Sequence, residues 1–492
     1  NNSLLRMTFR RAFTVPAVAA VAVAVAFGVF YAELQRINYP IKHPIDHNPD
    51  RLLLHTSVFT NVRVVRVDSS FARPDLLDDT ERSVTVAYSN TVFNATIELR
   101  GRLAGGLYGK NSYKIKLVDS EGDKLKVALL PGQSHLTHHY TLRSAKLDPT
   151  VYRDALAQDI WAALSDACAA PRVVLPYEHI ELRWNDLSLG LYILFVSPRR
   201  ESHPSFNKKT DSLIEYDAGQ YEGKDGMLED EPHAVLVEAL QNATFDPASY
   251  AAEFLMGELA RDHDTHIKSM FLALQANQIV FGPQWDFDLA FASYRSPASY
   301  GRPSGWLAAV SPSARIFPPV FGWERLRLHP WFHADTAKTY STQIQGCWSA
   351  FRSNYTLPTI SDEFISNVKQ NSRMWDYRQT LPRTYLLLKS TAVFDYGGGR
   401  MSKTTGDGAL ELSRLLSYID ARMRWMDAAM HELDGSMTPL DVKTTPGINA
   451  QVYWALIVTA AVCAGAAAII LLLWAGMPQH DKMVADALQP FL

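Results

Sequence analysis

Two long runs without a charged residue bracket the chain. The first covers residues 12–32 and is dense in Ala, Val and Phe, and the second covers 451–477. At 1.5 Å per residue, each run is long enough to cross a hydrocarbon core of about 30 Å. This pattern predicts one transmembrane helix near each end, with a large polar body between the two.

Shorter periodicities organise the polar body. Apolar and polar positions alternate over 59–67, 83–88 and 95–99, as they do in strands with one buried face. Helical spacing covers 148–169 and 247–260, each with an Asp-Pro pair near its start. Strands followed by a mainly helical C-terminal half predict a domain of the α+β class.

Composition narrows the classes of function. Nearly half of the 492 residues are hydrophobic, so the chain can bury a large core, and its formal net charge is only −3. The sequence has neither a basic stripe nor an Arg-rich arm, which argues against nucleic acid as a partner. Its three cysteines cannot build a disulfide framework. Cys168 and Cys347 can form one bridge at most, while Cys463 lies in the second apolar run.

The strongest candidate chemistry follows the strand-like run 278–281. Asp286 and Asp288 stand two residues apart beside Trp285, and paired carboxylates of this kind suit Mg²⁺ and phosphate. Upstream lie the polar segment 261–269 and the lysine-bearing strand 112–117. A lysine strand, then a polar segment with Asp, then paired Asp is the order of parts in a phosphoryl-transfer site. The alternative is a strand end with a capping Asp and a buried Trp.

Several other segments fall in order around these motifs, at 98–102, 105–117, 140–143, 148–157, 170–171, 181–192 and 283–288. From about Glu98 to Tyr294 the series resembles the CotH family of atypical, spore-coat-type kinases. The resemblance implies an atypical protein-kinase-like (CotH) domain that uses Mg²⁺ and ATP.

The resemblance also assigns roles by position. It implies that Asp264 is the catalytic base and that Lys114 or Lys116 reaches the phosphates. It places Arg100 and Gly101 in the phosphate loop. Metal binding is implied for three residues, namely Asp286, Asp288 and Ser269.

Two departures from the family pattern indicate an eroded site. Val196 stands where the family has the glutamate that orients the lysine, so a replacement would have to come from Glu201 or Glu215. Ser269 replaces an asparagine that binds a second metal. Because this chemistry depends on positioning and charge, such losses compound. We therefore expect a degenerate kinase, or pseudokinase, that acts as an accessory subunit and holds no cofactor. The alternative is an active Mg²⁺- and ATP-dependent kinase of a lumenal or periplasmic compartment.

These observations divide the chain into seven parts: a positive tail (1–11), a transmembrane helix (12–32), a tether with a β-rich part (33–97), a CotH kinase-like core (98–295), a mainly helical part (296–445), a second transmembrane helix (451–477) and a C-terminal tail (478–492). The expected fold class is thus an α+β kinase-like domain with one transmembrane helix at each end.

The charges before the first apolar run predict the orientation. Arg6, Arg10 and Arg11 should stay on the positive-inside face, which puts the central domain on the other side of the membrane. A Glu-free, Arg-containing start favours the mitochondrial inner membrane over a secretory membrane, with a transit peptide removed before Asn1. The expected partners are lipid and other membrane-protein subunits.

Overall fold

The structure is a computed structural model. It describes residues 59–70, 80–100, 110–202, 206–217, 220–229, 231–262, 269–275, 277–293, 303–304, 306, 334–375 and 406–432.

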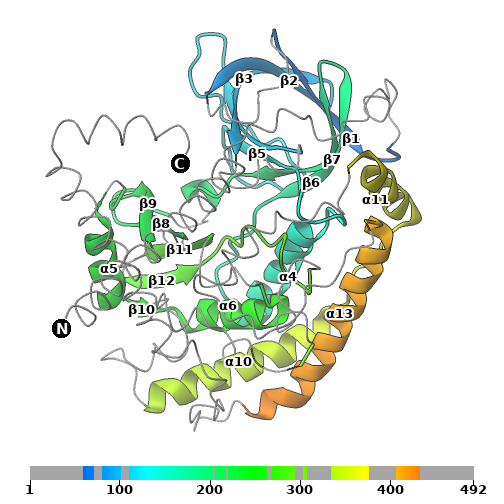
Figure 1. The fold of residues 1–492 in the computed structure, drawn as a ribbon. Coiled ribbons are helices and arrows are strands. Elements are labelled where there is room, and N and C mark those ends of the chain that lie inside the picture. The colour runs from blue at the N-terminus through cyan, green and yellow to red at the C-terminus, as the bar shows by residue number, and fades with distance from the viewer. Residues whose placement is uncertain are drawn as a thin grey trace, which may run out of the picture. The chain divides into compact units, whose positions relative to one another are not determined.

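The N-terminal half of the described chain forms a closed barrel of seven strands (Figure 1). Its strands are β1 (Arg63–Asp68), β2 (Arg82–Tyr88), β3 (Thr91–Arg100), β4 (Ser112–Val118), β5 (His139–Arg143), β6 (Tyr177–Trp184) and β7 (Leu187–Val196), in the order β1-β2-β3-β4-β5-β7-β6. Parallel pairing of β1 with β6 closes the barrel, whereas all its other strand pairs are antiparallel.

Alternate side chains of each strand point into the barrel core and out toward its surface. On β4, Tyr113, Ile115 and Leu117 are buried in the barrel core, as the sequence pattern predicts, and Lys114 and Lys116 point outward.

A five-stranded sheet lies beyond the barrel, in the order β10-β12-β11-β8-β9 (Figure 1). The strands are β8 (Ser212–Asp217), β9 (Gln220–Gly226), β10 (Thr244–Phe245), β11 (Met270–Gln275) and β12 (Gln278–Phe281). The Trp285–Asp288 motif follows the β11–β12 hairpin closely in the chain. The sheet therefore sets the position of the candidate site.

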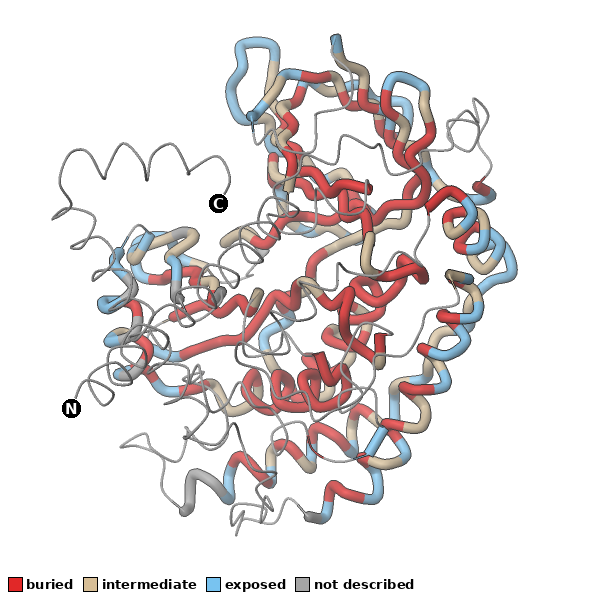
Figure 2. The backbone as a smooth tube through the Cα atoms, viewed as in Figure 1, coloured by how far each residue is buried: buried red, intermediate tan, exposed pale blue. Residues whose placement is uncertain are grey.

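Six helices are described: α4 (Arg153–Cys168), α5 (His233–Asn242), α6 (Pro247–Ala260), α10 (Ala334–Asn354), α11 (Asp362–Met374) and α13 (Gly408–Ala429), with short 3₁₀ turns η1 (Arg200–Ser202) and η2 (Met430–Glu432). Helices α4 and α6 are largely buried (Figure 2) and belong to one core with the five-stranded sheet. Helix α10 packs on both, and a Cys168–Cys347 disulfide fastens it to α4.

The helix starts follow their sequences. Asp246 caps α6 by accepting a hydrogen bond from the Ser249 N–H, and Pro247 occupies the first helical position. At α4, the Asp148 carboxylate accepts hydrogen bonds from the N–H groups of Tyr152 and Arg153. The Asp-Pro pairs therefore mark both helix starts, although α4 itself begins five residues after Asp148.

The predicted fold class is wrong. The structure has a seven-stranded barrel and a separate five-stranded sheet, not a kinase-like domain between two membrane helices. The physical reason is long-range strand pairing. Residues 63–67, expected to belong to a separate N-terminal part, pair in parallel with 180–184 and close the barrel. The boundary expected at residue 97 falls inside β3.

The predicted two-span membrane protein is likewise corrected. Within the ranges given above, no helix is both long and apolar enough to cross a membrane. The longest helices there, α10 and α13, both carry charged residues along their length. The apolar runs 12–32 and 451–477 lie outside the described residues, and the predicted localisation as a two-span integral membrane protein is corrected with them.

Candidate functional site

Three hydrogen bonds to two helices hold the segment that follows β12. Gln158 Nε2 on α4 donates to the Gln284 carbonyl at 2.7 Å, and Gln284 Nε2 donates to Glu253 Oε2 on α6 at 2.6 Å. The Phe287 N–H donates to Asp154 Oδ1 at 2.7 Å. Two helices thus fix the backbone on either side of Trp285 and Asp286.

Arg143, the last residue of β5, is the centre of the site. Its guanidinium donates to Asp154 Oδ2 at 2.8 Å and to Asp286 Oδ1 at 2.7 Å, and it lies 3.9 Å from Asp288 Oδ2. Burial alone would lower the pKa of Arg143, but these three carboxylates outweigh burial and hold it well above its ordinary value. One buried cation therefore joins the barrel, α4 and the segment after β12.

Burial acts on the Asp154 carboxyl in the direction opposite to its effect on Arg143. Burial raises the pKa of Asp154, and the charge of Asp286 adds to that effect, while Arg143 opposes it. Asp286 also accepts a hydrogen bond from Ser269 Oγ at 3.2 Å. Asp286 and Ser269 have φ angles of 68° and 59°, in the left-handed region that non-glycine residues rarely adopt. The backbone is thus held in an unusual conformation where these side chains meet.

Trp285 forms the apolar wall of the site. Its ring contacts Phe195 of β7 edge-to-face, with centroids 5.7 Å apart. Two guanidinium groups lie over the same indole, Arg100 at 4.4 Å and Arg143 at 5.3 Å from the ring centroid. Both are within the range of cation–π attraction.

Arg100, at the end of β3, lies on the barrel side of this wall. Its Nη1 donates to Thr141 Oγ1 at 3.1 Å, and that hydroxyl is 2.7 Å from Ser197 Oγ. Burial and the charges of Arg143 and Arg199 lower the pKa of Arg100 to about 10, against the opposing pull of nearby carboxylates. The barrel therefore presents cations on the face where the segment after β12 presents carboxylates.

Lys146 adds another cation beyond the end of β5. Its amine is shielded from solvent and makes no hydrogen bond within the part of the chain that the structure describes. The pKa of Lys146 is lowered to about 8, chiefly by burial; the charge of Arg143 also lowers it, while Asp288 and Asp286 raise it. Sequence reasoning missed this residue because a single lysine between two motifs carries no pattern.

The structure brings together some of the residues predicted for this site. Ser269 and Asp286 are in contact, and Asp286 and Asp288 both lie near Arg143. Asp264 and Gly101 lie outside the described residues. Arg100 reaches the site from β3.

The strand lysines have partners on the barrel itself. Lys114 Nζ lies 2.5 Å from Glu98 Oε1 on β3, and Lys116 Nζ lies 2.5 Å from Glu81 Oε2. Val196, which stands where the family has a glutamate, is part of the barrel core and supplies no carboxylate to the lysines. The two glutamates named as replacements pair elsewhere, Glu201 with Lys126 and Glu215 with Lys224.

Asp286, one of the residues implied for Mg²⁺, is paired with an arginine in this arrangement. Among the described residues, no group of three or more His, Cys, Asp or Glu side chains is placed to hold a metal ion. Asp286 and Asp154 instead share one guanidinium, which offsets part of their negative charge. A divalent ion here would have to compete with Arg143 at short range.

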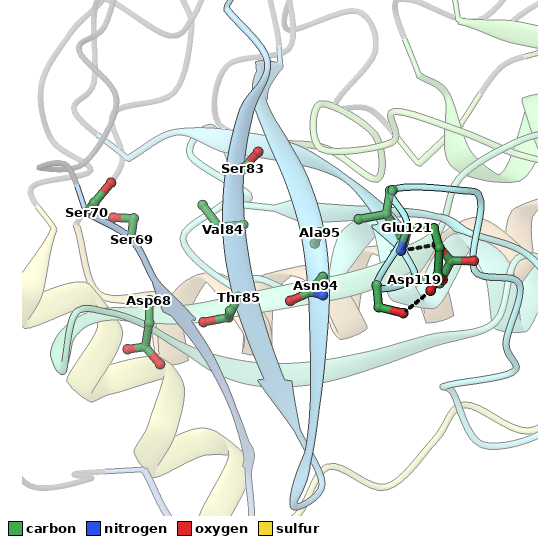
Figure 3. Close-up of a pocket in the computed structure, with 13 residues that line it drawn as sticks. Asp68, Ser69, Ser70, Ser83, Val84, Thr85, Asn94, Ala95, Asp119 and Glu121 are labelled. Carbon is green, nitrogen blue, oxygen red and sulfur yellow. Dashed lines mark hydrogen bonds between the residues drawn. The ribbon is translucent and has the colours of Figure 1, made fainter.

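A second hollow, of about 660 Å³, lies on the outside of the barrel (Figure 3). It is lined by polar and small apolar residues from the end of β1, from β2 and β3 and from the turn after β4, and Asp68, Asp119 and Glu121 are among them. Asp119 accepts hydrogen bonds from the N–H groups of Glu121 and Asp123, so it stabilises its own turn. This hollow lacks the convergent cations of the Arg143 site.

Comparisons with known proteins give no family for the chain. No protein-family model matches it, and no curated protein matches it significantly. The resemblance to CotH kinases therefore rests on the motifs alone.

Proposed function

We propose that this protein is an accessory subunit that does not transfer phosphoryl groups, and that its motifs derive from a CotH-type kinase site. The observation that carries the proposal is the position of Arg143 between Asp154 and Asp286, at 2.8 and 2.7 Å. In a phosphoryl-transfer site such carboxylates hold Mg²⁺ against the phosphates. Here the carboxylates bind Arg143 instead and form an ionic joint between β5, α4 and the segment after β12.

The strand lysines support this proposal. Lys114 and Lys116 are engaged with glutamates on the barrel surface, and neither Glu201 nor Glu215 is free to orient them toward a phosphate. Losing about 3 kcal/mol of transition-state stabilisation at the lysine and again at the metal would slow transfer ~10⁴-fold if the losses add.

One observation favours the alternative, an active Mg²⁺- and ATP-dependent kinase. Ser269 Oγ lies 3.2 Å from Asp286 Oδ2, so a hydroxyl and a carboxylate oxygen already share one location, with Asp288 two residues away. If Arg143 turned toward Asp154 alone, these oxygens would be released for a cation.

Labelled ATP and Mg²⁺, incubated with the purified protein, test the proposal. We expect no transfer to the protein itself or to added acceptor proteins above the rate without protein. Robust transfer that is lost in Asp286→Ala and kept in Asp420→Ala would restore the active kinase. Asp420 is a suitable control because it pairs with Arg424 on the exposed surface of α13.

A further inference from the structure

Asn94 lies on the outer surface of β3, in the sequence Asn94-Ala95-Thr96. An asparagine followed by any residue except proline, and then by serine or threonine, is an acceptor sequence for N-linked glycosylation. The Asn94 side chain is exposed, whereas Ala95 belongs to the barrel core. No hydrogen bond joins the side-chain amide of Asn94 to the other residues drawn in Figure 3. A sugar on this amide would therefore lie outside the core and displace no contact among those residues.

The hollow of about 660 Å³ lies directly beside this asparagine (Figure 3). Thr85 of β2 pairs with Asn94 across the two strands, and both residues line the hollow. Residues 68–70 line it on one side of this strand pair, and residues 118–122 line it on the other. Its volume falls within the range of about 300–1,000 Å³ that small-ligand pockets have. The fold thus provides room for a sugar ring next to Asn94.

The lining of the hollow is suited to a neutral group rich in hydroxyls. It includes the carboxylates of Asp68, Asp119 and Glu121 and several serine and threonine hydroxyls, and none of the described residues that line it is Lys, Arg or His. Sugar hydroxyls donate hydrogen bonds to such oxygens, whereas the carboxylates repel phosphate and other anions. The carboxylates also form no metal site within the described ranges, where no group of three or more His, Cys, Asp or Glu side chains could hold an ion.

The Cys168–Cys347 disulfide provides an independent indication of where the chain folds. Both cysteines are buried, so the bridge lies within the core between α4 and α10. Structural disulfides form and persist in oxidising compartments, of which the lumen of the endoplasmic reticulum is one. N-linked glycans are attached in that same lumen. The disulfide and the acceptor sequence therefore point to one compartment from unrelated parts of the chain.

We propose that Asn94 carries an N-linked glycan and that the first sugar of this glycan lies in the hollow beside Thr85. The donor is an oligosaccharide linked to a lipid diphosphate. The Asn94 amide nitrogen loses one proton and bonds to the anomeric carbon of the first sugar, while the bond from that carbon to the lipid diphosphate breaks and the diphosphate leaves. This goes beyond the proposed function, because an ionic joint at Arg143 needs no glycan.

Peptide mapping of the protein purified from the cells that make it tests the modification. Peptide N-glycosidase in heavy-oxygen water converts a glycosylated asparagine to a labelled aspartate, and we expect this label at Asn94. When expressed in the same cells, Asn94→Gln and Thr96→Ala should each lose the mass of one glycan. Thr96→Ser is the matched control, because serine completes the acceptor sequence and the glycan should remain. An unlabelled Asn94 peptide, or a label confined to the acceptor sequences at Asn242 and Asn354, overturns the proposal.

Melting temperatures test the place of the first sugar. From the native cells, the parent should melt about 2 °C or more above Asn94→Gln, since only the parent has the contacts of the sugar with the hollow. Made in the oxidising periplasm of a bacterial host without N-linked glycosylation, which preserves the disulfide, the same two proteins should melt alike. Equal melting of the two proteins from the native cells would overturn the seating in the hollow. A difference of the same size in the bacterial host would do so too, because it would arise from the Asn94 side chain itself.

Discussion

The Arg143 guanidinium lies 2.7 Å from Asp286 Oδ1, across a separation of 143 residues. It contacts Asp154 Oδ2 at 2.8 Å at the same time. A single side chain thus fastens the end of β5 to α4 and to the segment after β12. Asp286, one of the candidate metal ligands, is thereby part of a structural joint.

Replacing Arg143 should therefore unfold the protein more easily. Arg143→Met leaves the buried Asp154 and the half-buried Asp286 without their cation, and breaking a buried pair from one side costs about 3–5 kcal/mol. Urea denaturation measures the loss. Arg424→Met is the control, because it breaks an exposed pair with Asp420 on α13 and should cost under about 1 kcal/mol. Equal, small effects of both variants would contradict the joint.

The Cys168–Cys347 disulfide should also stabilise the protein, but it acts by restricting the unfolded chain. It closes a loop with a sequence separation of 179 between α4 and α10. Restricting the unfolded ensemble by a loop of this size is worth about 5 kcal/mol in the chain-entropy picture, and less if the reduced state keeps structure. We expect the double variant Cys168→Ala/Cys347→Ala to melt at a lower temperature than the oxidised protein. Adding reductant should shift the melting temperature of the parent and leave that of the variant unchanged.

Local pattern predicted local structure well in this chain. The helical spacing over 247–260 matches α6, and the alternation at 113–117 gives the correct inward and outward faces of β4. These features depend on neighbours within a few residues, so the sequence contains the information. Ser269 Oγ lies 3.2 Å from Asp286 Oδ2, and their role as metal ligands stays a prediction.

Pairings between distant segments were not predictable. The register that places Glu98 beside Lys114 depends on how β3 meets β4, and the barrel closes through β1 and β6, more than 100 residues apart. Nothing in the spacing of Arg143, Asp154 and Asp286 indicates that they share a contact. Lys114 and Lys116 belong to a recognisable sequence motif. Arg143 and Lys146 belong to no such motif, and their place in the site follows only from burial in the folded chain.

Lys146 should be a source of instability near neutral pH. Burial lowers the pKa of its amine to about 8, so the folded state disfavours the charged form. When the pKa of a lysine is lower in the folded protein than in the unfolded chain, the free energy of unfolding is smallest below the folded pKa. The free energy of unfolding should therefore rise as the pH increases from about 8 toward the ordinary lysine pKa near 10.5. We expect Lys146→Met to stabilise the protein at pH 7 by about 1–3 kcal/mol and to flatten this rise. Chemical denaturation at pH 7 and pH 9.5 gives both quantities, and a destabilised variant at pH 7 would show that Lys146 has a favourable partner instead.

Glu253 should produce the opposite pH dependence. Burial raises the pKa of its carboxyl to about 7, despite the hydrogen bond it accepts from Gln284. A carboxyl with a raised folded pKa binds more protons folded than unfolded, so its contribution is fully present below about 4.5 and is lost as the pH rises through 7. Because one pKa unit is worth 1.36 kcal/mol, the loss is at most about 3 kcal/mol. Glu253→Gln keeps an acceptor for Gln284 and removes the titration, so its free energy of unfolding should exceed that of the parent at pH 8 and match it near pH 4.5. Urea titrations of both proteins across pH 4.5–8 check this, and parallel curves would place the titrating group elsewhere.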